Sequence, residues 1–455
     1  MKQLPARIHF VGIGGTGLSA IARVLAERGW TVTGSDRQAS PRTAMLQQLG
    51  VPVTIGHAPD HARQADMVVR SSAVPDTDAD VAAAREAGVP VLKRREFLPY
   101  LTADYKVLAV AGSHGKTTTT AMLAWVLTAL GHAPTFIAGA EVANLGVNAR
   151  AGQGAFFVIE ADEYDHMFLG LAPYAAIVTN VEHDHPDMFP TAEAFREAFL
   201  RFVNRVQPEG FLLVCADDEG SRALTAAHPH VWSYGMHARA DYRATDLQPN
   251  SCGGYDFVAQ WQGEPLAQVS LRVPGEHNVQ NALAVLAMVH RLGLDTAAAA
   301  QALHAFRGTA RRFEIVGEAG GVVFVDDYAH HPTEIRATLA AARQRYPHHA
   351  VWAVWQPHTF SRTRTLLNDF AAAFAQADAV VITEVFAARE TAPDDFGGAQ
   401  IAQVTEHTYK FFAPTLREAA DILVEHVQPP AVVVVLSAGD APQITRWALE
   451  GWQAK

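Results

Sequence analysis

Short apolar runs alternate with amphipathic segments along the whole chain. Runs such as Ile8–Val11, Val107–Ala111 and Val322–Val325 are bounded by glycine or acidic residues, which is typical of buried parallel strands. A segment with apolar residues at helical spacing follows each of them, as in residues 117–130. This alternation of predicted strands and helices favours an α/β fold with parallel sheets.

The alternation occurs in three successive units, and 455 residues are too many for a single core. We predict a first doubly wound domain over residues 1–105, a central domain over residues 106–308 and a third domain over residues 309–455. Within the central domain, the short alternating stretches of residues 241–273 predict a small antiparallel part at one edge of the parallel sheet. In the third domain, the pattern predicts one continuous helix over residues 363–375.

Composition narrows the class of protein. The net charge is −11 and no block of basic residues occurs, which argues against nucleic acid as a main partner. Cys215 and Cys252 are the only cysteines, so neither a disulfide framework nor a cysteine metal cluster is expected. No signal core precedes the first strand, and no run approaches the roughly 18 apolar residues that span a bilayer. We therefore expect a cytoplasmic protein with no membrane partner.

The strongest chemical signal lies between the strand at Val107–Ala111 and the following helix. The intervening residues are Gly112, Ser113, His114, Gly115, Lys116, Thr117 and Thr118. A glycine-rich turn that opens a helix directs backbone N–H groups and the positive helix dipole at one point, which favours phosphate. Lys116 adds a charge, and Thr117 adds a hydroxyl that can ligate Mg²⁺. We prefer a phosphate loop to an ordinary turn because the glycines, the lysine and the threonine each lie at the position that phosphate and Mg²⁺ binding requires.

This phosphate loop is shorter than usual. The common pattern has four residues between its glycines, whereas two separate Gly112 from Gly115.

Acidic and imidazole side chains follow the next two predicted strands, at residues 156–159 and 176–179. These side chains are Glu160, Asp162, Glu163, Glu182, His183, Asp184 and His185. Because the carboxyl ends of parallel strands meet at one edge of a sheet, we expect them to converge on the phosphate loop. Carboxylate and hydroxyl oxygens suit Mg²⁺, with an occasional imidazole. The alternative is that these are charged loop residues that only face solvent. A zinc site is disfavoured because no further ligands occur at structural-zinc spacing.

The first strand leads into a second glycine pattern. Residues 12–17 fit G-x-G-x-x-G, and Asp36 lies about 20 residues further on, as in a dinucleotide site of a Rossmann-like domain. The obvious ligands are NAD or FAD, but the pattern indicates only that a pyrophosphate could bind at this helix end. Glycines that merely allow close helix packing are the structural alternative.

Two later segments complete the candidate site. Asn278 and Asn281 share a helix face, where amides could bind a purine edge; capping by Asn278 is an equally good explanation. Strand ends of the third, also Rossmann-like, domain carry Asp326, Asp327, His330, His331, His358, Arg362 and Arg364. As a group they predict a second wall of the site.

Several motifs together resemble one family. GSHGKTTT, EADE, TNVEHDH, PGEHNVQN, ARRFE, DDYAHHP and QPHTFSR occur in the order found in the ATP-dependent Mur ligases of peptidoglycan synthesis. The central domain then resembles a phosphate-loop ATPase. Within the family, HFVGIGGTGLSAIA with GSD is similar to members that join L-alanine to UDP-N-acetylmuramate. Two alternatives stay open: a relative that adds murein tripeptide and, from another class, an NAD-dependent oxidoreductase built on residues 12–17.

The resemblance implies a role for each candidate residue. The UDP part of the sugar nucleotide would contact Gly14, Gly15, Gly17, Ser35, Asp36 and Ser71. ATP would contact Gly112–Thr118, with His277, Asn278 and Asn281 on its adenine side and Arg312 and Asp327 reaching it from the third domain. Metal ligands would be Thr117, Glu160 and His185. The catalytic set would be Lys116, His185, His358 and Arg362.

The resemblance also implies a reaction and its partners. ATP would phosphorylate the muramate carboxylate with the help of Mg²⁺, and the amine of L-alanine would attack the acyl phosphate. His358 is a candidate proton acceptor for that amine. The third domain would close over the site to exclude water, and the protein would act as a monomer or homodimer.

Overall fold

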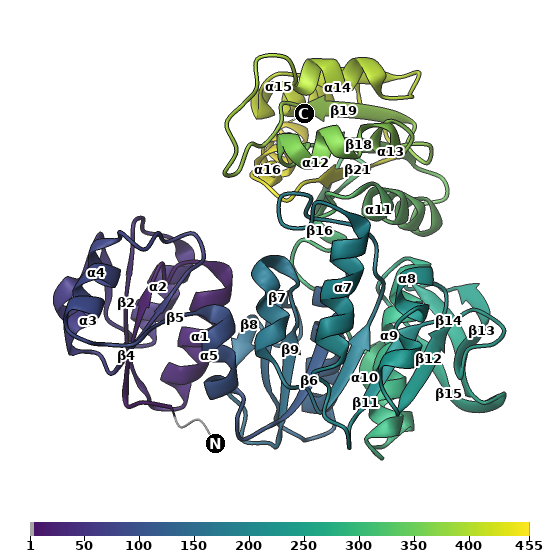
Figure 1. The fold of residues 1–455 in the computed structure, drawn as a ribbon. Helices are drawn as coiled ribbons and strands as arrows, with labels where there is room; N and C mark the ends of the chain where they lie inside the picture. Colours follow the sequence, from purple (N-terminus) through teal and green to yellow (C-terminus); the bar gives the residue numbers. More distant parts are fainter. Residues whose placement is uncertain (1–3, 455) are drawn as a thin grey trace.

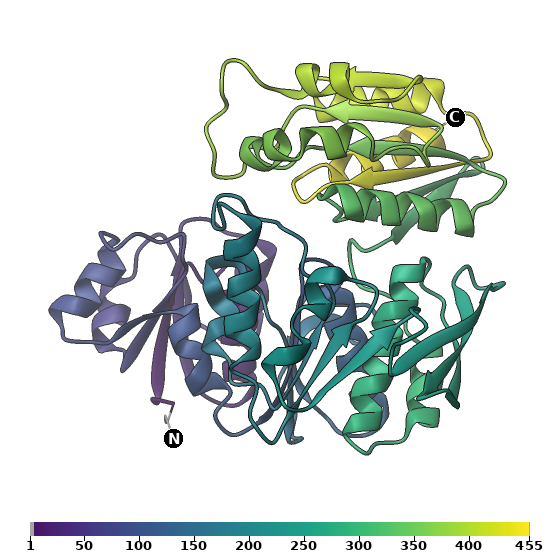
Figure 2. The ribbon, with the colours of Figure 1, turned by 45° about the vertical axis from the view of Figure 1, so that its right-hand side comes forward.

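The computed structural model describes residues 4–454, which form three sheets in succession along the chain. The first unit lies beside the central one, and the third lies across one end of the central unit (Figure 1). A view turned by 45° shows the third unit on the same side of the central unit (Figure 2). The predicted three-domain α/β fold is confirmed. No helix among the described residues has the length and apolarity needed to cross a bilayer.

Five parallel strands form the first sheet, in the order β3-β2-β1-β4-β5. The strands are β1 (Arg7–Val11), β2 (Thr31–Asp36), β3 (Val53–Ile55), β4 (Met67–Arg70) and β5 (Val91–Lys93), and the helices are α1 (Thr16–Glu27), α2 (Pro41–Gln48), α3 (Pro59–Gln64), α4 (Ala79–Glu86) and α5 (Arg94–Leu101). The strand order reverses between β1 and β4, which places a crevice at their carboxyl ends.

The central sheet has ten strands in the order β15-β14-β13-β12-β11-β10-β6-β9-β7-β8. They are β6 (Lys106–Ala111), β7 (Thr135–Val142), β8 (Val147–Arg150), β9 (Phe156–Glu160), β10 (Ala175–Val178), β11 (Phe211–Cys215), β12 (Val231–Gly235), β13 (Tyr242–Pro249), β14 (Tyr255–Trp261) and β15 (Glu264–Ser270). Strands β13, β14 and β15 pair antiparallel, as predicted. The helices are α6 (Lys116–Ala129), η1 (Tyr164–Gly170), α7 (Ala192–Val203), α8 (Glu219–Arg222), η2 (Thr225–Ala227), α9 (Glu276–Arg291) and α10 (Thr296–His304).

Helix α6 lies at the centre of this domain. Most of its side chains are buried, because it packs against α9, α10 and strands β7 and β9. A helix that is apolar on nearly all sides is typical of such an internal position. Its first turn, which carries Lys116 and Thr117, is therefore fixed relative to the sheet.

The third sheet has the order β16-β17-β21-β18-β19-β20. Its strands are β16 (Glu314–Ala319), β17 (Val322–Asp327), β18 (Ala350–Trp355), β19 (Ala379–Thr383), β20 (Lys410–Ala413) and β21 (Ala431–Leu436), and its helices are α11 (Pro332–Arg345), α12 (Phe360–Thr365), α13 (Leu367–Ala371), α14 (Gly398–Val404), α15 (Leu416–His426) and α16 (Pro442–Gln453). The all-Val run of β21 is completely buried, as expected for a central parallel strand covered on both faces.

The prediction of one continuous helix over residues 363–375 is wrong. The chain forms α12 and α13 with a break at Leu366, whose φ is −105°. The break has a tertiary cause, since it lets Arg362 of α12 reach the central domain while Phe370 of α13 stacks on Trp355 with ring centroids 4.6 Å apart.

Candidate active site

The shortened phosphate loop joins β6 to α6 and is braced by the end of β10. Gly112 has a φ of +139°, and a Cβ there would lie 1.9 Å from Thr179 Oγ1, so only glycine fits. The Ser113 N–H donates to the Asn180 carbonyl at 3.0 Å. The His114 N–H donates to Asn180 Oδ1 at 2.8 Å. Hydrogen bonds to Asn180, just after β10, thus fix the conformation of the phosphate loop.

Lys116 lies at the start of α6, is partly buried and is paired with an acidic residue. Its Nζ lies 2.9 Å from Glu163 Oε2 and donates to the Gly112 carbonyl at 2.6 Å. Burial lowers the pKa of Lys116, but Glu163, Asp162 and Glu160 raise it by more, so the lysine is a cation. Glu163 is one of the side chains expected to converge on the phosphate loop, but no role was predicted for it, and its pairing with Lys116 is what the structure adds.

Thr117 and Glu160 lie together beside the phosphate loop. The Thr117 hydroxyl donates to Glu160 Oε1 at 3.0 Å, and the Gly139 N–H donates to Glu160 Oε2 at 2.6 Å. Burial raises the pKa of Glu160, which Lys116 opposes. A hydroxyl and a carboxylate suit Mg²⁺ that also takes phosphate and water oxygens. In the described part of the chain, no group of three His, Cys, Asp or Glu ligands includes Glu160, so the chain itself would supply few ligands.

Asp184 and His185 contact Arg362 of the third domain. Arg362 Nε donates to Asp184 Oδ1 at 2.9 Å, and both side chains are almost completely buried. Arg362 also donates to His185 Nδ1 at 3.2 Å, while His185 Nε2 lies 3.4 Å from Glu163 Oε1. With Nδ1 accepting from Arg362, the ring proton lies on Nε2 toward Glu163. Neither nitrogen therefore offers a free lone pair to a metal, and His185 would have to turn to act as a ligand.

His358 lies beside Arg362 on the third-domain wall. Arg362 Nη1 donates to His358 Nδ1 at 3.1 Å. Burial, reinforced by Arg362, lowers the pKa of His358 to about 4. A neutral ring that accepts at Nδ1 carries its proton at Nε2. The arrangement thus presents His358 as a hydrogen-bond donor, which does not suit the proton-accepting role that we considered.

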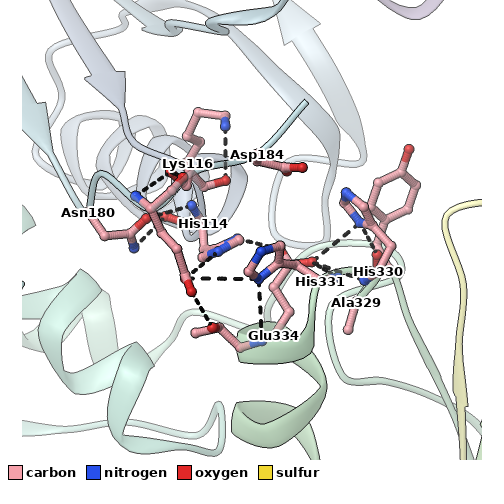
Figure 3. Close-up of polar contacts among 12 residues, drawn as sticks. His114, Lys116, Asn180, Asp184, Ala329, His330, His331 and Glu334 are labelled. Carbon is pink, nitrogen blue, oxygen red and sulfur yellow. Dashed lines mark hydrogen bonds and ion pairs between the residues drawn. The ribbon is translucent and has the colours of Figure 1, made fainter. Parts of the chain in front are cut away.

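His114 forms a second bridge between the domains. Its Nε2 lies 3.0 Å from Glu182 Oε2 of the central domain. Its Nδ1 lies 3.3 Å from Glu334 Oε1 on α11, and Figure 3 shows His114 and Glu334 side by side. Burial lowers the pKa of His114, but Glu182 and Glu334 raise it by more, to about 9. Arg312 Nη1 also lies 3.5 Å from Glu334.

Glu182 is among the side chains expected to converge on the phosphate loop but has no predicted role, and Glu334 is absent from the predicted site. Glu182 belongs to TNVEHDH, whereas Glu334 follows His331 at the position of a capping box, a pattern that indicates a helix start and no chemistry.

A cavity of about 210 Å³ adjoins the phosphate loop. Its lining includes Gly115, Thr118, His277, Asn278, Asn281, Arg312 and Asp327. Asn278 Nδ2 donates to the Pro274 carbonyl at 2.7 Å, while Gly275 is the N-cap of α9 and no side chain caps it. The capping explanation for Asn278 is therefore wrong. Burial and Arg312 lower the pKa of His277 to about 4, which leaves a neutral ring.

A cavity of about 370 Å³ lies at the β1–β4 crevice of the first domain. Its lining includes Gly14, Gly15, Ser35, Asp36 and Ser71. The Gly14 N–H donates to Asp36 Oδ2 at 2.8 Å, and the Ser35 hydroxyl donates to Asp80 at 2.6 Å. These two side chains therefore brace the pocket wall as well as line it.

Gly17 lies apart from this first-domain pocket. A Cβ at Gly17 would lie 2.2 Å from Arg94 Nη1, and Arg94 in turn lies 3.2 Å from Asp162 of the central domain. Of the residues predicted to contact UDP, Gly17 is the one that lies outside the pocket and instead allows Arg94 to pack against α1.

The largest of these cavities, about 670 Å³, is where the three domains meet. It is lined by Thr16 and Arg42 of the first domain, by Lys116, Thr117, Glu160 and His185 of the central domain, and by Arg312, His358 and Arg362 of the third. Four predicted members of the third-domain wall do not line this cavity. Asp327 lines the 210 Å³ cavity, and the ring centroid of His331 lies 4.7 Å from that of His114. Arg364 pairs with Asp395 at 2.9 Å, and Asp326 is hydrogen-bonded to Thr445.

A parallel-sheet domain with a phosphate loop lies between two Rossmann-like domains, and all three line a common cavity, as in an enzyme that brings a nucleotide together with further ligands. Three family models match the chain: "Mur ligase family, catalytic domain" over residues 7–106, "Mur ligase middle domain" over residues 110–289 and "Mur ligase, glutamate ligase domain" over residues 311–439. The chain belongs to the Mur ligase family, as predicted.

Relatives of known name are similar over most of the chain. The UDP-N-acetylmuramate–L-alanine ligase of Frankia casuarinae is 47% identical, with 87% of this chain and 85% of the relative covered. That of Roseiflexus castenholzii is 41% identical, with 97% and 96% covered. The solved UDP-N-acetylmuramate-alanine ligase of Thermotoga maritima has a TM-score of 0.83 at 31% identity, with 98% and 99% covered. A murein peptide ligase from Psychrobacter arcticus has a TM-score of 0.71 at 25% identity, with 99% of both chains covered.

Proposed function

We propose that this protein joins L-alanine to the carboxylate of UDP-N-acetylmuramate with consumption of ATP, in the synthesis of peptidoglycan precursors. One observation supports this most directly: the phosphate loop, the first-domain wall and the Arg362–His358 segment line one cavity. A reaction of three ligands needs such a meeting point. The names of relatives that are 37–47% identical support the choice of substrates.

Each domain would hold one ligand. The first, residues 1–105, would hold the UDP part at Gly14, Gly15, Asp36 and Ser71. The central domain, residues 106–308, would hold the ATP phosphates at residues 112–118 and adenine near His277, Asn278 and Asn281. The third, residues 309–455, would receive the amino acid beside His358 and contribute Arg312 and Asp327 to the ATP side.

The charges of the site match the first chemical step. Two anions, the γ-phosphate and the muramate carboxylate, must approach each other, and electrostatic neutralisation is where most catalysis of phosphoryl transfer arises. Lys116, which is paired with Glu163 in this structure, would turn part of its hydrogen bonding to the phosphate. Thr117 and Glu160 would hold Mg²⁺, which supplies neutralising charge when bound. In the second step the amine would attack the acyl phosphate, the C–O bond to phosphate would break, and the amide would form with release of inorganic phosphate and a proton. The contacts of Arg362 and His114 between the domains would keep water out.

The test is ADP release by the purified protein with UDP-N-acetylmuramate, offering L-alanine, L-serine, glycine and murein tripeptide singly. We expect release only when ATP, the sugar nucleotide and an amine are all present, and fastest with L-alanine. A preference for the tripeptide would establish the alternative ligase. Release that depends on neither the sugar nucleotide nor an amine would refute the ligase proposal, and NAD binding would favour the oxidoreductase.

A further inference from the structure

Arg389 lies at the cavity where the domains meet. It belongs to the loop after β19 and lines the 670 Å³ cavity beside His358 and Thr359. Its side chain is exposed. Among the described residues, no carboxylate oxygen lies within 4.0 Å of its guanidinium nitrogens. The guanidinium contacts an aromatic ring instead, with Cζ 5.0 Å from the centroid of Tyr164.

Other cations of this cavity already have partners. Lys116 is paired with Glu163, Arg312 with Glu334 and Arg362 with Asp184, and Arg311 donates to the Ser437 and Gly439 carbonyls. Arg42 resembles Arg389 in having no ion pair among the described residues, but it starts from α2 of the first domain. On the third-domain wall, Arg389 is thus a cation without an ion-pair partner among the described residues, and an anionic ligand can pair with it.

The loop that carries Arg389 is held against the segment that carries His358. Glu390 Oε2 accepts the N–H groups of Phe360 and Ser361 at 2.6 and 3.0 Å. The Thr359 N–H donates to the carbonyl of Phe386 at 2.9 Å. These bonds fix the backbone on both sides of Arg389 relative to α12.

The Tyr164 ring connects Arg389 with the reaction centre. Its centroid lies 5.1 Å from that of His185, and its hydroxyl donates to Asp187 Oδ2 at 3.0 Å. His185 in turn contacts Arg362. Arg389 therefore lies one aromatic ring away from the buried contact between the two domains, within reach of a small ligand in the cavity.

We infer that Arg389 binds the α-carboxylate of the incoming amino acid, an inference that rests on the ligase function proposed above. The amino acid brings an amine that reacts and a carboxylate that does not. Glu160 and Asp162 on the central-domain wall disfavour that carboxylate, whereas a guanidinium binds it by donating two parallel hydrogen bonds. Binding at Arg389 directs the amine inward to the activated carboxyl group.

Steady-state kinetics of ADP release with the whole protein test this role. The variants are Arg389→Gln, Arg389→Lys and, as a matched control, Arg364→Gln, whose arginine pairs with Asp395 outside the cavity. L-Alanine is compared with L-alaninamide, which lacks the carboxylate charge. If the amide is not turned over, its inhibition constant against L-alanine is measured instead.

We expect Arg389→Gln to raise the KM for L-alanine at least tenfold, with the KM values for ATP and UDP-N-acetylmuramate within about twofold, as loss of one charge-assisted contact predicts. The KM or inhibition constant of L-alaninamide should change little in Arg389→Gln. The KM for L-alanine in Arg389→Lys should lie between those of Arg389→Gln and the unaltered protein, and that of Arg364→Gln should equal the unaltered value. An unchanged KM for L-alanine, or an equal loss with the amide, would overturn the inference. Absence of any amine-dependent ADP release in the unaltered protein would instead refute the proposed function.

Discussion

Arg362 of the third domain and Asp184 of the central domain form a buried ion pair, with Nε 2.9 Å from Oδ1 and side chains only 5% and 3% exposed. Burial raises the pKa of Asp184, but Arg362 and His185 lower it well below its usual range. The pair therefore holds the third domain against the central domain.

Asp184→Asn should destabilise that arrangement. It leaves the Arg362 guanidinium buried without its counter-charge, and breaking a buried pair in this way costs about 3–5 kcal/mol. Urea unfolding measures the change, and Asp395→Asn is the control, because the Arg364–Asp395 pair is exposed and should contribute less than about 1 kcal/mol. Equal midpoints for the two variants would contradict the structural importance of the buried pair.

Lys116→Ala should lower turnover at least about a hundredfold, the scale of losing one electrostatic contact in a transition state. It should also lower the melting temperature, because Glu163 is then buried without the lysine. The double variant Lys116→Ala, Glu163→Gln should regain the melting temperature and not the turnover. Activity in the single variant, or recovery of activity in the double one, would show that the lysine serves only the fold.

Stability should fall with rising pH through His114. Its folded pKa of about 9 lies above the ordinary value of 6.5, so the folded state holds the proton more tightly. The resulting stabilisation, about 3 kcal/mol at most, is complete below pH 6.5 and is lost as the pH rises through 9. Melting temperatures over this range should decline less in His114→Asn than in the unaltered protein or in the control His348→Asn, an exposed histidine. Parallel curves for all three would exclude this role.

Thr117→Val should raise the Mg²⁺ concentration that gives half-maximal ADP release by about tenfold, the scale expected when a group that holds or orients a metal ligand is lost. The variant keeps the shape of the side chain and removes the hydroxyl that contacts Glu160. Thr128→Val in the same helix is the control, because that hydroxyl is bonded to the Ala124 carbonyl. A Mg²⁺ requirement that does not differ between these variants would remove Thr117 from the metal site.

The phosphate loop and the strands and helices around it could be predicted from the sequence because each depends on residues that are neighbours along the chain. Gly112, Gly115 and Lys116 lie at the start of one helix, and the strand and helix periods around them report burial directly. The α/β fold and the family follow from such patterns, and both are confirmed. The break between α12 and α13 was missed because periodicity does not record the direction in which a helix must point.

The sequence by itself determined which chemical groups are present and at which strand ends they stand. Tertiary structure alone decided which of them meet. Glu334 reaches His114 across a domain boundary, whereas Arg364, only two residues after Arg362, points away to Asp395. Pairing energies depend on distance and burial, and for residues far apart in the chain these are set by how the domains pack and not by any local pattern.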